Sequence, residues 1–161
     1  MDKKIVVSNS TPIINFATID RMDILHALYG QLLIPDAVWG EIVVKGINYV
    51  ASSRLKKLDW IQKQSVKKDN FLKMLKAKLD DGESEAISLA IESKADLVLL
   101  DEKSAKNVAD AMGLNFMGTL GCLLLAKKLG IIDRMKPIID QIMVDAKFWI
   151  SETLYKTLDK E

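Results

Sequence analysis

The sequence has little of what several classes of protein require. It contains one cysteine, Cys122, and one histidine, His26, which excludes an internal disulfide and a zinc site built from His and Cys side chains. The apolar run at residues 123–126 is far shorter than the ~18 residues of a membrane span. Three apolar residues follow the lysines at the N-terminus, too few for a secretory signal. We therefore expect a cytoplasmic protein without a membrane segment.

Net charge is also nearly absent, but the charged residues are unevenly distributed. The 161 residues include 23 Lys and Arg against 22 Asp and Glu, and 49% are hydrophobic, which is typical of one globular domain and excludes a disordered chain. Residues 51–80 carry 9 basic and 3 acidic side chains, and residues 81–102 carry 1 and 7. Such neighbouring blocks can place an anion-attracting face beside a cation-binding pocket, although two solvated helix faces would give the same pattern.

A glycine-rich phosphate loop is missing, since neither GxGxxG nor GxxxxGK[ST] occurs. This absence weighs against a Rossmann-like small-ligand protein, which remains the more distant alternative. His26 lies within a predicted helix, away from any strand end, and we expect no catalytic role for it. Cys122 is expected to be a buried thiol, and the three tryptophans are expected to anchor packing rather than to stack on bases.

Short apolar runs alternate with amphipathic segments along the chain. Strands are predicted at residues 5–8, 32–34, 60–66, 97–100 and 115–117. Helices are predicted from about residue 12 and at residues 23–29, 35–46, 71–79, 83–93, 105–112, 120–129, 133–146 and 151–159. This alternation predicts an α/β fold whose parallel sheet is covered by helices on both faces. In such folds ligands bind outside the carboxyl ends of the strands, where Asn9, Asp101 and Thr119 stand.

Carboxylates are the remaining candidates for chemistry. Glu41, Glu83 and Glu85 lie on predicted helices, and Asp101 ends the most apolar strand. Glu83 lies on the apolar stripe of its helix, whereas Glu85 is turned roughly 200° away. An inward carboxylate needs a partner, and oxygen ligands suit Mg²⁺ or Mn²⁺. Helix capping and ion pairing would account for the same side chains equally well.

Five short blocks of the sequence resemble, in order, those of the PIN-domain-like family, in the group described as predicted nucleic-acid-binding proteins related to VapC-type toxins. The blocks are VVSNSTPII at residues 6–14, LIPDAVWGE at 33–41, LDDGESEAI at 79–87, a fourth that starts with LLDE at 99–102, and GTLG at 118–121. Together they extend over most of the chain.

This resemblance implies a single three-layer α/β/α domain over residues 1–161, with a short and mainly parallel central sheet, that cleaves RNA with Mg²⁺ or Mn²⁺. Position by position, it implies catalytic and metal-ligating roles for Glu41, Glu83 and Asp101, with Asn9 and Glu85 as further candidates. A metal-bound water of lowered pKa would attack the phosphodiester. The expected nucleic-acid contacts are Ser10, Thr119, Lys63, Lys67 and Lys68, of which the lysines belong to the basic block.

Asn9 departs from the family pattern, which has aspartate at this position. An amide oxygen can coordinate a cation but carries no charge, so we expect weaker metal binding. The change also relieves repulsion among the other carboxylates when no metal is bound. Two functions remain open: a weakened metal-dependent endoribonuclease, or a non-catalytic PIN-like module that binds nucleic acid or a partner such as an antitoxin-like protein.

The C-terminal helices, predicted within residues 133–159, carry an additional apolar stripe. Its members are Ile138, Ile139, Ile142 and Met143 on one helix and Leu154 and Leu158 on the next. Such a stripe either packs onto the domain or forms a homodimer surface.

Overall fold

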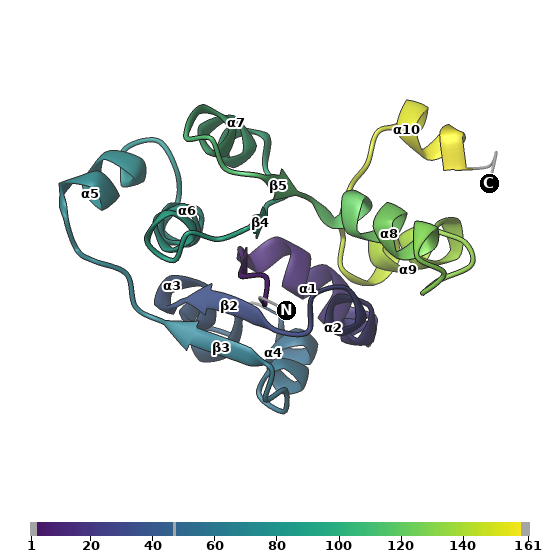
Figure 1. Cartoon of the computed structure of the whole chain (residues 1–161). Helices are drawn as coiled ribbons and strands as arrows, with labels where there is room; N and C mark the ends of the chain where they lie inside the picture. The colour runs from purple at the N-terminus through teal and green to yellow at the C-terminus, as the bar shows by residue number, and fades with distance from the viewer. Residues whose placement is uncertain (1–2, 47, 159–161) are drawn as a thin grey trace.

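Short apolar runs form the strands of a parallel sheet in this computed structural model, which describes residues 3–46 and 48–158 (Figure 1). The strands are β1 (Val6–Ser8), β2 (Leu32–Pro35), β3 (Ile61–Gln64), β4 (Leu97–Leu99) and β5 (Phe116–Met117). Their order is β3-β2-β1-β4-β5, and every neighbouring pair is parallel. The predicted α/β fold with a parallel central sheet is confirmed.

Helices cover both faces of this sheet (Figure 1). They are α1 (Ser10–Thr18), α2 (Met22–Tyr29), α3 (Asp36–Trp39), the π-helix η1 (Gly40–Val44), α4 (Tyr49–Leu55), α5 (Asn70–Lys76), α6 (Asp81–Glu92), α7 (Lys103–Ala111), α8 (Thr119–Lys128), α9 (Lys136–Asp145) and α10 (Glu152–Thr157). The helices that contribute to the larger buried cluster are α1, α2, α3, η1, α4, α8 and α9, and those of the smaller cluster are α5, α6 and α7. The chain therefore has the three layers that the resemblance implies.

Alternate residues of β1, β2, β4 and β5 enter the two clusters, whereas residues 62–64 of β3 are exposed. Val6 belongs to the larger cluster and Val7 to the smaller, and Leu99 and Val98 divide in the same way. A strand with both faces buried has no polar side, so its sequence is a continuous apolar run instead of an alternation.

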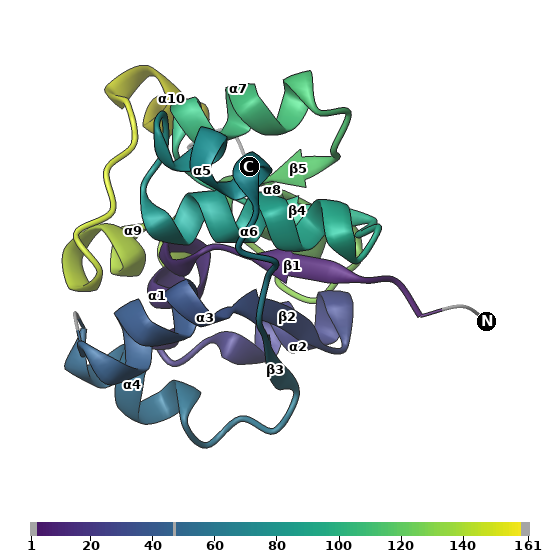
Figure 2. The same ribbon diagram turned by 90° about the vertical axis from the view of Figure 1, so that its left-hand side faces the viewer.

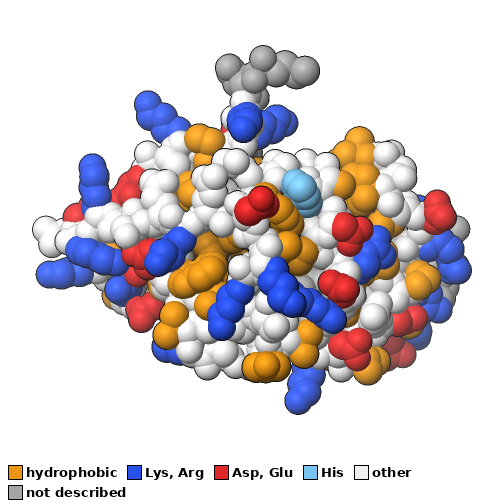
Figure 3. Space-filling view, turned by 90° about the horizontal axis from the view of Figure 1, so that it is seen from below, with side chains coloured by type: hydrophobic (Ala, Val, Ile, Leu, Met, Phe, Trp, Pro, Cys, Tyr) orange, Lys and Arg blue, Asp and Glu red, His pale blue; other side chains and the backbone are white. Residues whose placement is uncertain are grey.

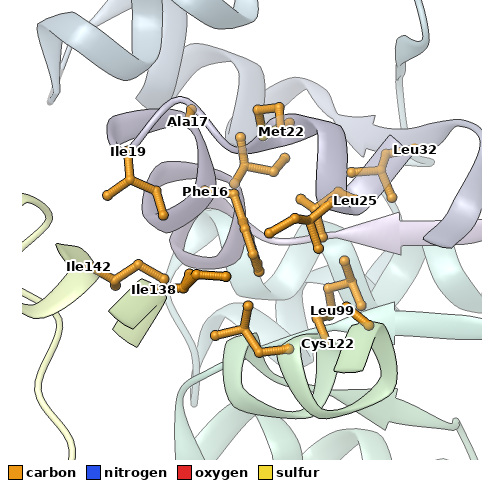
Figure 4. Packing of buried hydrophobic residues seen from close by; sticks show 14 of the residues in the cluster. Phe16, Ala17, Ile19, Met22, Leu25, Leu32, Leu99, Cys122, Ile138 and Ile142 are labelled. Atoms are coloured by element: carbon orange, nitrogen blue, oxygen red, sulfur yellow. The ribbon is translucent and has the colours of Figure 1, made fainter. Parts of the chain in front are cut away.

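Phe16 of α1 is fully buried and stands at the centre of the larger cluster (Figure 4). Leu25, Leu99, Cys122 and Ile138 surround it from α2, β4, α8 and α9. Cys122 is buried as expected, and burial raises the pKa of its thiol to about 12. A thiol that is protonated at neutral pH is a poor nucleophile, so Cys122 acts as a packing residue.

The apolar stripe of α9 belongs to the same core. Ile138, Ile139 and Ile142 are buried in the larger cluster, and Met143 packs against it. The α9 stripe therefore packs onto the domain and is no open dimer surface. On the second stripe, Leu158 is buried and Leu154 is exposed. The last helix was predicted to end at residue 159, which lies outside the described residues.

Two local features differ from the predictions. Helix α4 was not predicted, because its buried side chains include the small residues Ala51 and Ser52, which give little hydrophobic periodicity. The helix predicted at residues 35–46 is divided into α3 and η1, and its last backbone bond runs from Lys45 N–H to the Gly40 carbonyl. This bond spans five residues, which is the π-helical pattern and is common at functional sites.

Within the described ranges, no helix is long and apolar enough to cross a membrane.

Candidate functional site

The residues that follow the strands lie along one edge of the sheet, as predicted. The Asn9 amide donates to the Leu99 carbonyl, and the Thr119 amide donates to Asp101 Oδ1 over 2.8 Å. Figure 2 shows the sheet from the side, with β1 running from the N-terminus towards this edge. The carboxyl ends of β1, β4 and β5 thus bring three of the predicted residues to one side of the molecule.

Asn9 and Glu41 direct oxygen atoms to the same point beside Gly82. Asn9 is the N-cap residue of α1, yet its side chain makes no capping hydrogen bond. A Cβ atom on Gly82 would lie 2.6 Å from Glu41 Oε1 and 3.1 Å from Asn9 Oδ1. The other oxygen of Glu41, Oε2, accepts a hydrogen bond from the Ser10 hydroxyl. The missing side chain at Gly82 therefore leaves a space that both oxygens border.

Glu83 lies next in sequence and forms a capping box at the start of α6. Its Oε1 accepts from the Asp80 amide over 3.1 Å, and its own amide donates to Asp80 Oδ1 over 2.8 Å. The inward orientation predicted for Glu83 is confirmed by its burial, since its exposed fraction is 5%. One oxygen of the Glu83 carboxylate thus caps the N-terminus of α6, and helix capping is the structural role that the sequence also allowed.

Glu85 is equally buried, with an exposed fraction of 5%, so the prediction that it faces outward was wrong. Helix α6 contacts β1, β2 and β4 on one side and α3, α5 and α7 on the others, which leaves little of its circumference exposed. Glu85 Oε1 accepts from the Ala37 amide over 3.1 Å, and its Oε2 lies 3.4 Å from Lys68 Nζ. These contacts hold the start of α3 against α6.

Asp101 is held by both of its oxygens. Thr119 donates its amide to Oδ1 over 2.8 Å and its hydroxyl to Oδ2 over 2.7 Å, and Asn15 Nδ2 donates to the same hydroxyl over 3.0 Å. Gly118 is the N-cap residue of α8 and has no side chain to offer, so Asp101 caps this helix from another strand. A Cβ atom on Gly118 would lie 2.7 Å from Asp101 Oδ1 and 3.1 Å from Lys106 Nζ.

Burial raises the pKa of Glu41, Glu83 and Asp101 above the usual carboxyl range. For Glu41, the Ser10 hydroxyl opposes this shift and the negative charges of Asp80 and Asp81 add to it. Glu102 adds to the shift at Glu83, and the Thr119 hydrogen bonds oppose the shift at Asp101.

Sequence reasoning missed three of these acidic neighbours, which are Asp80, Asp81 and Glu102. They could have been found from their positions in the sequence, because each lies within three residues of a predicted site residue. Carboxylates with raised pKa values at one edge of a sheet are typical of a site that attracts positive charge.

The side chains at this edge of the sheet include oxygen donors suited to a divalent cation. Among the described residues, no three His, Cys, Asp or Glu side chains are grouped closely enough to hold a metal ion. The converging atoms, Asn9 Oδ1 and Glu41 Oε1, are hard oxygen donors of the kind that Mg²⁺ and Mn²⁺ prefer. The chemistry of this pair fits a hard cation, but the amide at Asn9 leaves the pair with only one negative charge.

The predicted nucleic-acid contacts fall into two groups. Ser10 and Thr119 are buried and bonded to Glu41 and Asp101, which favours a role in orienting these carboxylates. Lys63, Lys67 and Lys68 are exposed, and Lys63 Nζ lies 5.9 Å from the centre of a Trp39 ring. Figure 3 views the underside of the molecule in Figure 1, near α4 and β3, and shows Lys and Arg side chains among hydrophobic and acidic ones.

The chain has a parallel three-layer α/β fold with acidic side chains beyond the carboxyl ends of its strands. A family model described as PIN domain matches residues 5–161, and the chain therefore belongs to the PIN-domain family. This membership indicates a nuclease-type fold. PIN domains generally use divalent metal ions, and membership indicates nucleic-acid binding. No curated protein matches the sequence.

Replacing Glu41 with glutamine is expected to stabilise the metal-free protein. Because burial raises the pKa of Glu41 in the folded state, its ionised form costs stability at pH 8, and this cost disappears below the ordinary value of 4.5. Glu41→Gln should therefore raise the melting temperature by about 2–4 °C at pH 8 and leave it unchanged near pH 4, as measured by circular dichroism. The matched control is Asp110→Asn, which removes a charge from an exposed position of α7. An equal gain at both pH values would contradict the electrostatic explanation.

Proposed function

We propose that the chain is a single cytoplasmic PIN-like domain that acts as a weakened, divalent-metal-dependent endoribonuclease. Asn9, Glu41 and Asp101 would hold Mg²⁺ or Mn²⁺, with Glu83 as the neighbouring acidic group. The observation that carries this proposal is the pair of oxygens beside Gly82. Asn9 stands where its side chain would ordinarily cap α1, yet its Oδ1 lies with Glu41 Oε1 instead. A purely structural asparagine at this position would be expected to make the capping bond.

The cation, when bound, supplies positive charge at the scissile phosphate and lowers the pKa of the attacking water. The chain's own residues prepare the site for it. The Ser10 hydroxyl fixes the orientation of Glu41, and Thr119 with Asn15 fixes that of Asp101. Because these partners are buried, the carboxylates are held in place before any ligand arrives, which reduces the free energy needed to organise the site.

The second candidate function is a non-catalytic module that binds nucleic acid or an antitoxin-like protein. It is favoured by the internal hydrogen bonds of Glu41, Glu83 and Asp101, all of which have partners in the protein itself. The absence of a three-carboxylate group among the described residues supports it as well. Neither function requires a homodimer.

A calorimetric titration of chelator-treated protein with Mn²⁺ distinguishes the two functions. We expect saturable binding that is lost in Asp101→Asn, together with Mn²⁺-dependent cleavage of single-stranded RNA that the variant lacks. Asp110→Asn removes an exposed charge and serves as the matched control, with binding and cleavage expected to be unchanged. If the parent protein is folded and binds no Mn²⁺, the endoribonuclease proposal fails and the non-catalytic module takes its place.

A further inference from the structure

The segment between α9 and α10, residues 146–151, lies at the same edge of the sheet as the candidate site. Two cavities, of about 470 and 250 Å³, are both lined by Asp101, Phe148 and Trp149. The larger volume is within the range of ~300–1,000 Å³ that is typical of small-ligand sites. In Figure 2 the yellow-green chain between α9 and α10 runs along the side towards which β1 points. A molecule bound in either cavity would therefore contact both Asp101 and this segment.

Trp149 is 77% exposed, which corrects the expectation that it anchors packing. Trp39 and Trp60 do pack against the larger cluster, so Trp149 is the exception. Its neighbour Ile150 is buried and Phe148 is half-buried, and both hold the segment against the protein. A large aromatic ring that faces water on a segment anchored in this way is available for a partner.

The backbone also sets the position of this ring. Lys147 has a φ of 55°, in the left-handed region that residues other than glycine rarely occupy. Asp20 and Lys94 adopt the same conformation directly after the C-caps of α1 and α6, so at Lys147 it marks the end of α9. The turn at Lys147 follows the end of α9, and the chain then runs past Asp101.

Positive charge stands on both sides of Asp101. Lys147 and Glu102 line the larger cavity, and Lys106 lines the smaller one close to the Asp101 carboxylate. An occupant whose anionic group pairs with these lysines and whose flat apolar ring meets the exposed indole would match this surface. A nucleotide has both groups, because its anionic phosphate and its flat base are joined through one sugar.

We propose that Trp149 is a stacking platform for an unpaired base of single-stranded RNA whose backbone phosphate lies near Asp101. The inference rests on the proposed function, because it places the scissile region at the same edge of the sheet. An aromatic ring stacks on any base, so Trp149 contributes affinity without selecting a sequence. A base within a duplex is already stacked and paired, so duplex RNA gains nothing from this ring.

The test is the binding of fluorescein-labelled single-stranded RNA to the full chain in excess EDTA, followed by fluorescence anisotropy. Trp149→Ala should weaken binding about tenfold, and Trp149→Phe should stay close to the parent protein, because it retains an aromatic ring. Val144→Ala, which shortens a 76% exposed apolar side chain on α9, is the matched control and should change nothing. Duplex RNA should bind equally to the parent protein and to Trp149→Ala.

Equal affinity of the parent protein and Trp149→Ala for single-stranded RNA would overturn the inference, as would a parent protein that binds no RNA. A shift in oligomeric state on gel filtration with unchanged RNA affinity would also overturn it, because Trp149 would then belong to an interface between copies. Chelation separates this test from catalysis. A tenfold effect of Trp149→Ala in a protein that never cleaves RNA supports the stacking platform and overturns only the nuclease.

Discussion

Replacing Asn9 with aspartate is expected to tighten Mn²⁺ binding at least tenfold. The Asn9 oxygen and Glu41 Oε1 border the same space beside Gly82, so the substitution adds a negative charge to a donor atom that is in place. At an effective dielectric constant of 20, one added charge at contact distance contributes several kcal/mol, and about 1.4 kcal/mol suffices for a tenfold change. The same substitution should destabilise the metal-free protein, because the new charge stands next to the half-buried carboxylate of Glu41.

Calorimetry with Mn²⁺ and thermal unfolding in EDTA measure the two effects of Asn9→Asp. Asn107→Asp, at an exposed position of α7, adds the same charge away from the site and should change neither quantity. Unchanged or weaker Mn²⁺ affinity in Asn9→Asp would remove Asn9 from the set of proposed ligands.

Adding one methyl group at Gly82 is expected to weaken Mn²⁺ binding more than tenfold while the fold persists. The new Cβ would lie 2.6 Å from Glu41 Oε1, a distance that forces the carboxylate to move, and 3.1 Å from Asn9 Oδ1. Both atoms are ends of side chains, so they can shift without disturbing the backbone. Alanine also favours a helix over glycine by about 0.5–1 kcal/mol, and this gain offsets part of the cost within α6.

Gly40→Ala is the matched control for Gly82→Ala. Gly40 is adjacent to Glu41 in sequence, and a Cβ atom there would have no neighbour within 4 Å. Mn²⁺ titration of the two variants should show a loss only for Gly82→Ala, with melting temperatures within a few degrees of the parent protein. If Gly82→Ala binds Mn²⁺ as the parent protein does, the oxygens beside Gly82 are no metal ligands.

The central strands of the sheet could be predicted from the sequence because β1, β2 and β4 are largely buried on both faces. Val6, Val7, Val98 and Leu99 belong to runs that are apolar throughout, and each run ends at a polar residue. Ser8 and Asn9 follow the first run and Asp101 follows the second, so local pattern places Asn9 and Asp101 at one edge. The strand order was not predicted, since it depends on crossovers that leave no periodic signal.

Other features of the site depend on packing between distant segments. The burial of Glu85 follows from the way α3 and α5 close around α6, and a helical projection of α6 alone cannot show this. The convergence of Asn9, Glu41 and Gly82 joins residues from three separate elements, and the resemblance was the only indication of it. The exposure of Trp149 is likewise a property of the assembled edge of the sheet, where sequence reasoning assigned it to packing.

The capping of α8 by Asp101 links the helix to whatever binds at the edge of the sheet. Both oxygens of this carboxylate already accept hydrogen bonds from Thr119, the first residue of the helix. A ligand that binds the remaining lone pairs of these oxygens changes the charge that the helix end faces, and thermodynamic reciprocity makes this coupling mutual. Occupancy at Asp101 therefore alters the stability of the first turn of α8, and any restraint placed on that turn alters occupancy at Asp101.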